Sequence, residues 1–345
     1  MAATVVVGGQ FGSEGKGKIA AWLAPHFHHA VRTGGPNAGH TIVESGRSTV
    51  LRHLPCALIN PDAALYLGAG SILDPDILLR EIAENEISPA RLRIDPTAVV
   101  ITRSHLDDEV ELVNRIGSTG KGVGAAVVSK VLRAPGVVLA RDVPELSRYI
   151  GDVAGSLHRA LRAGENVLLE GTQGAGLSLH HGPYPFVTSR ETSAGSLCGE
   201  AGIGPRDVER VVLVVRTYPI RVAGTSGPLP NEISWDDVTA KSGYEMPIRE
   251  YTTVTGRLRR VGEFDLQAVT RAARLNSATE IALTFADYLD CSVRDATAGP
   301  ALTPPVVRFI DELEAATNTP VTIVSTGPET AATVVRQGRD GAREA

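Results

Sequence analysis

The segment Gly8-Gly-Gln-Phe-Gly-Ser-Glu-Gly-Lys-Gly-Lys18 has the composition of a phosphate-binding loop, with five glycines in its first ten positions. Glycines let a loop turn its N–H groups inward, and a helix that follows adds the positive end of its dipole. We predict that the triphosphate-binding residues here are Gly12, Gly15, Lys16, Gly17 and Lys18. The loop is an imperfect Walker A motif, because five residues rather than four separate Gly9 from Gly15 and because Gly17 replaces the usual Ser or Thr. The alternative is a glycine-rich turn with solvated lysines.

The elements around this loop predict an α/β fold. Thr4–Val7 is expected to be a buried strand and Lys18–Leu23 to open a helix, which is the start of a nucleotide-binding sheet. Further buried strands and helices alternate along the chain, so we predict a P-loop-like fold with a mostly parallel central sheet, covered by helices and long functional loops. The expected strands are 99–101, 137–139, 167–169, 211–215, 281–284 and 321–324, and the expected helices include 157–162, 266–275 and 307–316.

Composition and charge narrow the function classes. A net charge of −5 gives no global attraction to nucleic acid or membranes, and no apolar run approaches the length of a bilayer span. The three widely spaced cysteines do not form a metal or disulfide framework, which favours a reducing cytoplasmic location. We expect a single domain over residues 1–345, with a frayed tail at 337–345.

Several further motifs occur in order along the chain, and together they resemble the adenylosuccinate synthetase family. The glycine-rich loop is similar to the family's GxxGDEGKGK signature. The resemblance implies a ligase that phosphorylates the 6-oxo group of a purine nucleotide and replaces it with the amine of aspartate. The other matching segments are Gly34–Thr41, Gly117–Gly124, Glu170–Gly176, Tyr184–Ser189, Thr255–Arg260 and Ser325–Pro328.

The chemistry requires a hydrogen-bond donor at O6 and a charged site for aspartate. His40 can donate as negative charge develops on O6, and the resemblance places the Gln173 amide beside the same oxygen. Both residues also have structural alternatives, a core histidine and a loop-bracing amide. Forked guanidinium groups bind carboxylates, so the resemblance assigns aspartate to Thr255, Gly256, Arg257 and Arg259.

The remaining ligand residues are implied by the resemblance. The catalytic residues are predicted to be Ser13, Lys16, His40 and Gln173, and Mg²⁺ is assigned to Ser13 and Gly39. The triphosphate site would also include Gly39, His40, Thr41, Ser325, Gly327 and Pro328. The monophosphate nucleotide is assigned to Ser13, Asn37, Thr119, Gln173, Thr188 and Arg221, together with Arg133 of a neighbouring subunit in a homodimer.

Ser13 departs from the family pattern, which has Asp at this position. A serine hydroxyl is a poor base at neutral pH and a weak, neutral metal ligand. The protein is therefore an inactive relative, an ordinary synthetase with another base, or an enzyme for a different purine. Ser at this position resembles the viral branch of the family, which uses dGMP to make a precursor of 2-aminoadenine DNA. We therefore predict dGMP as substrate, with N1 deprotonation by water or a phosphate oxygen.

The segment Thr284-Phe-Ala-Asp287 is the second departure, because relatives carry a TKLD-like sequence that binds the guanine of GTP. Phe285 can stack on any base, so ATP or dATP is favoured over GTP, although Asp287 retains a group that pairs with guanine. Two other functions remain open: an ordinary IMP-specific synthetase with GTP, and a nucleotide switch or ATPase that is not a ligase.

Overall fold

The computed structural model describes residues 3–252 and 256–336. Its first strand, β1 (Ala3–Gly8), is buried along its whole length. Val5 and Val7 join the apolar core on one side of the strand, and Val6 joins the core on the other side. A strand covered on both faces has no need for polar residues at alternate positions, which explains the continuous apolar run.

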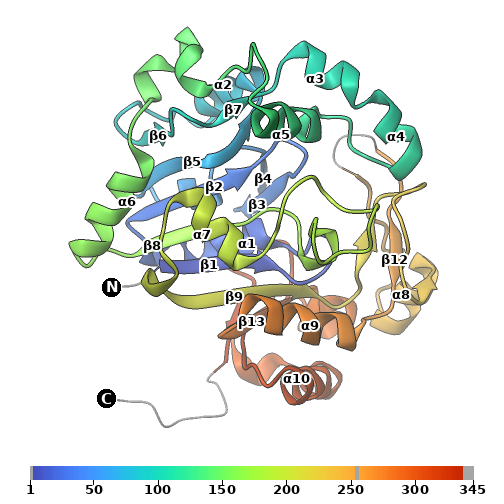
Figure 1. Ribbon diagram of the computed structural model, residues 1–345. Coiled ribbons are helices and arrows are strands. Elements are labelled where there is room, and N and C mark those ends of the chain that lie inside the picture. The colour runs from blue at the N-terminus through green and yellow to red at the C-terminus, as the bar shows by residue number, and fades with distance from the viewer. Residues whose placement is uncertain (1–2, 253–255, 337–345) are drawn as a thin grey trace.

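The central sheet of the described chain has ten strands, and all of its pairings are parallel except the edge pair β14–β15 (Figure 1). This confirms the predicted fold class. β7 (Val99–Val100) pairs with β5 off the main path. The order across the sheet is β15 (Thr333–Val335), β14 (Val321–Ser325), β13 (Glu280–Thr284), β9 (Val208–Arg216), β1, β8 (Val167–Glu170), β2 (His29–Gly34), β5 (Ala64–Leu73) and β6 (Leu92–Ile94).

Helices cover both faces of this sheet. The core on one face includes residues of α6 (Val153–Arg162), α7 (Ala194–Ala201), α9 (Leu266–Asn276) and α10 (Pro304–Thr317). The core on the other face includes residues of α1 (Lys16–Leu23) and α2 (Pro75–Glu84). Within the described residues, none of the helices combines the length and apolar character needed to cross a membrane.

Smaller elements surround the carboxyl ends of the strands. A hairpin of β3 (His40–Glu44) and β4 (Arg47–Leu51) follows β2, and a three-stranded sheet orders β10 (Ile220–Arg221), β12 (Arg260–Gly262) and β11 (Glu232–Ile233). In Figure 1, β12 lies beside α8 (Trp235–Ser242) at one end of the central sheet. The helices α3 (Arg103–Asp108), α4 (Val110–Ile116) and α5 (Val123–Leu132) form a separate group in the same view.

Two local expectations were wrong, and two strands were missed. Residues 137–139 do not form a strand, since only Leu139 makes an isolated bridge, to Val99. The helix α1 begins at Lys16 rather than Lys18, because Gly15 adopts a left-handed conformation (φ 87°) that ends the loop earlier. The sequence analysis also missed β2 and β5, whose polar residues Arg32 and Ser71 are buried within the fold. The predicted single-domain organisation stays a prediction, and the expected tail at 337–345 lies outside the described residues.

Candidate active site

The predicted site residues follow the carboxyl ends of neighbouring parallel strands. The glycine-rich loop follows β1, the segment containing Asn37 and His40 follows β2, and the segment containing Gln173 follows β8. β1 pairs with β8, which pairs in turn with β2. Loops at the carboxyl edge of a parallel sheet form a common ligand site in α/β proteins. The sheet order therefore explains why segments far apart in sequence meet.

The glycine-rich loop is built around Glu14, which the sequence analysis did not single out. Its buried carboxylate accepts hydrogen bonds from the backbone N–H groups of Gln10 (3.0 Å) and Gly12 (2.9 Å). It also pairs with the buried ammonium of Lys16 at 2.5 Å. A Cβ on Gly174 would lie 2.2 Å from a Glu14 carboxylate oxygen, so only glycine fits there. Glu14 thus fixes the shape of the loop and places Lys16.

His40 is held by the carboxylate of Glu170 at the end of β8. The distance from His40 Nδ1 to Glu170 Oε1 is 2.5 Å, and the other carboxylate oxygen accepts the Cys56 backbone N–H at 2.6 Å. Burial, together with the charge of Arg32, lowers the pKa of His40 to about 4. Burial alone would raise the pKa of Glu170, but its hydrogen bond to His40 and the Arg32 charge lower it instead.

These shifts favour a neutral His40 whose Nδ1–H donates to an ionised Glu170. Within the described residues, His40 Nε2 has no hydrogen-bond partner. In this tautomer Nε2 is an acceptor, so donation to O6 requires protonation of the ring. A Cβ on Gly17 would lie 2.7 Å from the His40 Cβ, which places this histidine against the start of α1.

Gln173 is oriented by polar neighbours on both sides of its amide. Its Nε2 donates to Asn37 Oδ1 at 3.2 Å, and its Oε1 accepts the Thr172 hydroxyl at 2.8 Å. Thr172 in turn accepts from the Arg190 guanidinium at 2.8 Å, and Arg190 forms an ion pair with Glu200. The structure therefore brings Asn37 and Gln173 together, and it presets the amide orientation before any ligand binds.

Ser13 lies between two arginines. Its hydroxyl accepts a hydrogen bond from Arg259 Nη1 at 2.7 Å, and its carbonyl accepts one from Arg216 Nη1 at 3.0 Å. The structure thus joins the loop after β1 to the predicted aspartate loop. Two cationic neighbours and a neutral hydroxyl do not suit a direct ligand of Mg²⁺. Ser13 therefore does not fit its predicted metal role, and the predicted metal role of Gly39 stays a prediction.

Lys18 and the late loop after β14 also come together. The Lys18 ammonium donates to Ser325 Oγ (2.7 Å), the Gly327 carbonyl (2.6 Å) and the Ala332 carbonyl (2.7 Å). An ammonium has three N–H donors, so these three contacts use all of them. Burial lowers the pKa of Lys18 to about 8, although nearby acidic groups oppose this shift. In this arrangement Lys18 anchors the loop to α1, and its predicted contact with a phosphate stays a prediction.

The segment predicted to bind the donor base follows β13. The Phe285 ring lies under the Arg216 guanidinium, whose carbon is 3.9 Å from the ring centroid, and it also packs against the Tyr288 ring, whose centroid is 5.1 Å away. Asp287 is buried and accepts the Tyr244 hydroxyl at 2.8 Å. Burial raises the pKa of Asp287, and the hydrogen bond from Tyr244 partly opposes the increase.

The residues predicted to hold the monophosphate nucleotide are less closely grouped. Arg221 is buried and donates to the backbone carbonyls of Phe186 (3.0 Å) and Pro228 (3.2 Å). Thr188 is partly buried, whereas Thr119 and Arg133 are exposed. Arg133 ends α5 and donates weakly to the Val131 carbonyl of its own chain at 3.4 Å.

Other predicted residues have fewer contacts. Arg257 and Gly256 are exposed beside Arg259, Gly39 and Pro328 are exposed in their loops, and Thr41 is exposed on β3. Thr255 lies outside the described residues. Their predicted ligand roles stay predictions.

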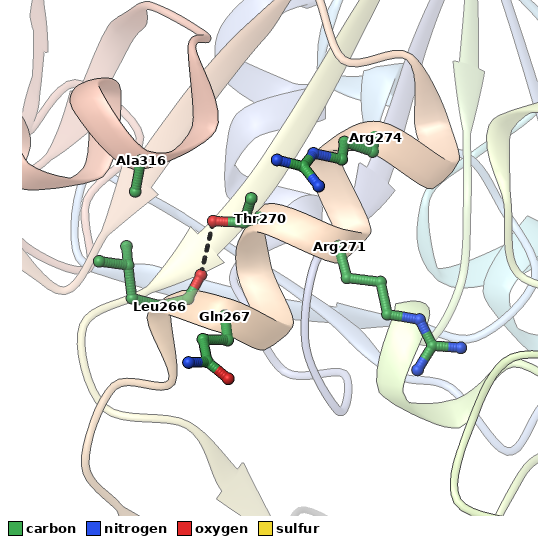
Figure 2. Close-up of a pocket in the computed structure, with 6 residues that line it drawn as sticks. All are labelled: Leu266, Gln267, Thr270, Arg271, Arg274 and Ala316. Atoms are coloured by element: carbon green, nitrogen blue, oxygen red, sulfur yellow. Dashed lines mark hydrogen bonds between the residues drawn. The ribbon is translucent and has the colours of Figure 1, made fainter.

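Two cavities lie at the surface, one beside Arg221 and one away from the predicted site residues. One, of about 400 Å³, is lined by Arg115 and Arg260 and also by Phe186 and Pro228, the two carbonyl partners of Arg221. The other, of about 360 Å³, lies between α9 and α10 and contains none of the predicted site residues (Figure 2). Figure 2 shows Arg271 and Arg274 on α9, with the Thr270 hydroxyl donating to the Leu266 carbonyl.

Sequence comparison identifies the family. The profile described as adenylosuccinate synthetase matches residues 5–143 and 139–294. The adenylosuccinate synthetase of Methanocaldococcus jannaschii is 42% identical over 334 residues, which cover 94% of each chain. The chain belongs to the adenylosuccinate synthetase family. It is therefore a ligase of the type that forms C–N bonds in purine nucleotides, and members of this family use a nucleoside triphosphate and Mg²⁺.

Two solved structures of the family have the same fold. The Plasmodium falciparum adenylosuccinate synthetase has a TM-score of 0.85 at 22% identity, over 97% of this chain and 99% of that chain. The succinoaminodeoxyadenylate synthetase (PurZ) of cyanophage S-2L has a TM-score of 0.83 at 32% identity, over 97% and 95%. The phage structure contains dGMP, and dATP as an energy donor.

Proposed function

We propose that this synthetase-family ligase condenses L-aspartate with dGMP at purine C6, with ATP or dATP as phosphoryl donor, to give N6-succino-2-amino-2′-deoxyadenylate. The observation that carries the proposal is Ser13, a neutral hydroxyl where the family signature has a carboxylate. The similarity to the phage protein that binds dGMP supports it.

The Ser13 hydroxyl has the hydrogen-bonding capacity that a 2-aminopurine requires. A hydroxyl offers one donor and two acceptor lone pairs, and Arg259 uses one of the lone pairs. The second lone pair can accept an N–H from the 2-amino group of guanine. Aspartate at this position would instead form an ion pair with Arg259, which would compete with the substrate carboxylate for that guanidinium.

The proposed reaction has two chemical steps. O6 of the nucleotide, after loss of the N1 proton to water or a phosphate oxygen, attacks the γ-phosphorus and breaks the β–γ anhydride bond. This releases ADP or dADP and leaves a 6-phosphoryl group. The aspartate amine then attacks C6, inorganic phosphate departs with the O6 oxygen, and the amine loses a proton.

His40 and Gln173 act on O6 in this scheme. Protonated His40 donates from Nε2 as charge develops on the oxygen, while Glu170 holds the ring through Nδ1. Negative phosphate groups beside the ring favour its protonated form and oppose the effect of burial. One N–H of Gln173 already bonds to Asn37, so the second remains to stabilise the same oxygen.

The donor-base segment supports ATP or dATP. A carboxylate that reads guanine accepts from both N1–H and N2–H, and at Asp287 the Tyr244 hydroxyl competes for this carboxylate by occupying one lone pair of Oδ2. The partly buried Phe285 ring can stack on a base without recognising its edge.

A homodimer is part of the proposal. The exposed end of α5 carries apolar side chains beside Arg133, with exposed fractions of 56% for Val128, 66% for Val131 and 70% for Leu132. Such side chains on one helix face are typical of a surface covered by a partner. Arg133 would then extend toward the monophosphate bound in the other subunit.

The ordinary reaction of IMP with aspartate and GTP is the second candidate. The identity to the archaeal adenylosuccinate synthetases favours it, since 42% to the M. jannaschii enzyme exceeds the 32% to the phage protein. In that case Ser13 would require another base for N1.

A coupled assay of triphosphate hydrolysis tests the proposal. We expect hydrolysis that depends on aspartate, and a kcat/KM for dGMP at least ~100-fold above that for IMP, since mismatched polar groups in a pocket commonly cause discrimination of this size. Equal or better use of IMP would reassign the substrate. Hydrolysis without aspartate would indicate a nucleotide switch.

A further inference from the structure

Arg216 lies at the end of β9, and its side chain is completely buried. Its guanidinium contacts three segments that are distant in sequence. Nη1 donates to the Ser13 carbonyl, both terminal nitrogens pair with the carboxylate of Glu250, and the planar group covers the Phe285 ring. The backbone of Arg216 is fixed as well, since the Gln10 side chain accepts from its N–H (2.9 Å) and donates to its carbonyl (3.0 Å).

These contacts form a closed ring with the aspartate loop. The Arg259 backbone N–H donates to the Glu250 carbonyl at 2.8 Å, and the Arg259 guanidinium donates to the Ser13 hydroxyl at 2.7 Å. Ser13 returns to Arg216 through its carbonyl. A shift of Arg216 must therefore move Glu250, and with it the backbone that positions Arg259.

We propose that Arg216 is a positioning residue that couples the donor-base subsite at Phe285 to the aspartate loop at Arg259. A base that stacks on Phe285 fixes the ring, and through it the guanidinium and Glu250. Arg259 is then preset for a substrate carboxylate. The inference deepens the proposed function and rests on it, because it assumes that the donor base and aspartate bind at these two places.

The simpler role for Arg216 is to neutralise the carboxylate of Glu250. That role explains the ion pair, but it does not require the contact with Phe285 or the hydrogen bond to Ser13. It also leaves Arg216 Nε, a buried donor, without a hydrogen-bond partner among the described residues. An unpaired buried donor is costly. The orientation of the Arg216 guanidinium is therefore set by its contacts with Ser13, Glu250 and Phe285, and not by a hydrogen bond from Nε.

Substitution by lysine separates the two roles. The ammonium group of lysine can keep an ion pair with Glu250. It lacks the planar guanidinium that pairs with Glu250, stacks on Phe285 and donates to the Ser13 carbonyl at the same time. Arg216→Lys should therefore fold and bind dGMP while losing the coupling. Phe285→Leu removes the stacked ring and leaves the ion pair intact, so it provides a second variant if the lysine protein fails to fold.

Calorimetric titration of aspartate into the protein saturated with dGMP, with and without a non-hydrolysable ATP analogue, tests the inference. We expect the analogue to tighten aspartate binding at least about fivefold in the wild type, the lower end of typical allosteric coupling. In Arg216→Lys and Phe285→Leu the factor should fall below about twofold. The control is Arg210→Lys, on the same strand, whose partner Glu280 lies 2.8 Å away and outside the site.

Wild-type coupling that persists in both variants would overturn the inference and leave the proposed function intact. Wild-type protein that binds dGMP and the analogue but never aspartate would overturn the proposed function and the inference with it. Loss of coupling in Arg210→Lys as well would also contradict the inference, since the effect would then not belong to the ring.

Discussion

At the scale of single residues, Ser13 determines how charge is distributed in the candidate site. Its hydroxyl is neutral and accepts from Arg259, so that arginine keeps its positive charge available for a ligand. A carboxylate at the same place would neutralise it. The residue at position 13 is thus expected to affect two substrates, the purine and aspartate.

Ser13→Asp tests this expectation. We predict that kcat/KM for dGMP falls by at least about tenfold, because the new carboxylate pairs with Arg259 and because the hydroxyl is lost. The KM for aspartate should rise in the same variant. Steady-state kinetics with each substrate varied in turn provide the measurement, and Ser13→Ala provides the control that removes the hydroxyl without adding charge. An unchanged aspartate KM in Ser13→Asp would show that Arg259 does not bind this substrate.

His40 gives a prediction about protons. The pKa of His40 is about 4 in the protein without ligand, and the proposed role requires an imidazolium in the complex. Ligand binding must then raise this pKa, so protons are taken up and binding tightens as the pH falls from 7 toward 5. Calorimetry of dGMP and ATP-analogue binding, in buffers of different ionisation enthalpy, should show net proton uptake at pH 7.

The matched variant for this measurement is His40→Asn, which retains a side-chain donor but does not titrate. The phosphate groups of the ligands also exchange protons, so the quantity that matters is the difference between the two proteins. Equal proton uptake by wild type and variant would remove His40 as the proton-accepting group.

At the scale of elements, the candidate site consists of loops whose neighbours are set by strand order. Lys18 shows why the sequence alone could not assign every role. Its place after a glycine-rich loop predicted a phosphate contact, whereas its three donors hold the loop after β14. That loop lies about three hundred positions further along the sequence. Two of the three acceptors are backbone carbonyl groups, which every residue has, so the sequence does not identify them. Arg216 was missed for the same reason, since its partners come from three separate segments, the glycine-rich loop and the segments containing Glu250 and Phe285.

The helix α5 carries the prediction about assembly. Val123 and Ala126 of this helix pack into a local core, while Val128, Val131 and Leu132 are exposed next to Arg133. If a second subunit covers this surface, Leu132→Glu should convert a dimer of twice 36.3 kDa into a monomer, because a buried unpaired carboxylate is strongly unfavourable. Sedimentation velocity measures the mass. Activity should fall with the monomer, since Arg133 would be lost from the neighbouring site.

The control is the same kind of substitution at an exposed apolar residue outside this surface. Val110→Glu, on α4, also places a carboxylate on an exposed apolar residue and should leave the mass unchanged if the surface around Leu132 is the interface. A monomeric wild type would contradict the assembly proposal directly.

At the scale of the whole molecule, the sequence predicted the sheet well where strands are uniformly apolar. β1, β8, β9, β13 and β14 were all anticipated, since both of their faces are covered by helices. β2 and β5 were not, because they contain Arg32, Thr33 and Ser71, whose burial depends on partners in other segments. A pattern of residue types reports burial only when the buried residues are apolar.

Those buried polar groups make the stability of the fold depend on pH. His53 is buried between β4 and α2, and its Nε2 accepts the Asp74 backbone N–H at 3.2 Å. Burial, together with the charges of Arg32 and Arg52, lowers the pKa of His53 to about 3. The unfolded chain binds a proton near pH 6.5 and the folded protein only near pH 3. The free energy of unfolding therefore falls as the pH decreases through this window, and the contribution is complete above pH 6.5.

His53→Gln isolates this effect, because the amide oxygen can still accept from Asp74 but cannot titrate. One group that is neutral when folded and protonated when unfolded contributes about 1.4 kcal/mol per pH unit. Urea unfolding between pH 4 and 6 should therefore give a slope of stability against pH that is smaller by about this amount in the variant. Above pH 7 the free energies of unfolding of the wild type and the variant should change with pH in the same way, even if one protein is more stable than the other. Identical slopes between pH 4 and 6 would mean that His53 is protonated in the folded protein, and that the cationic neighbours do not keep it neutral.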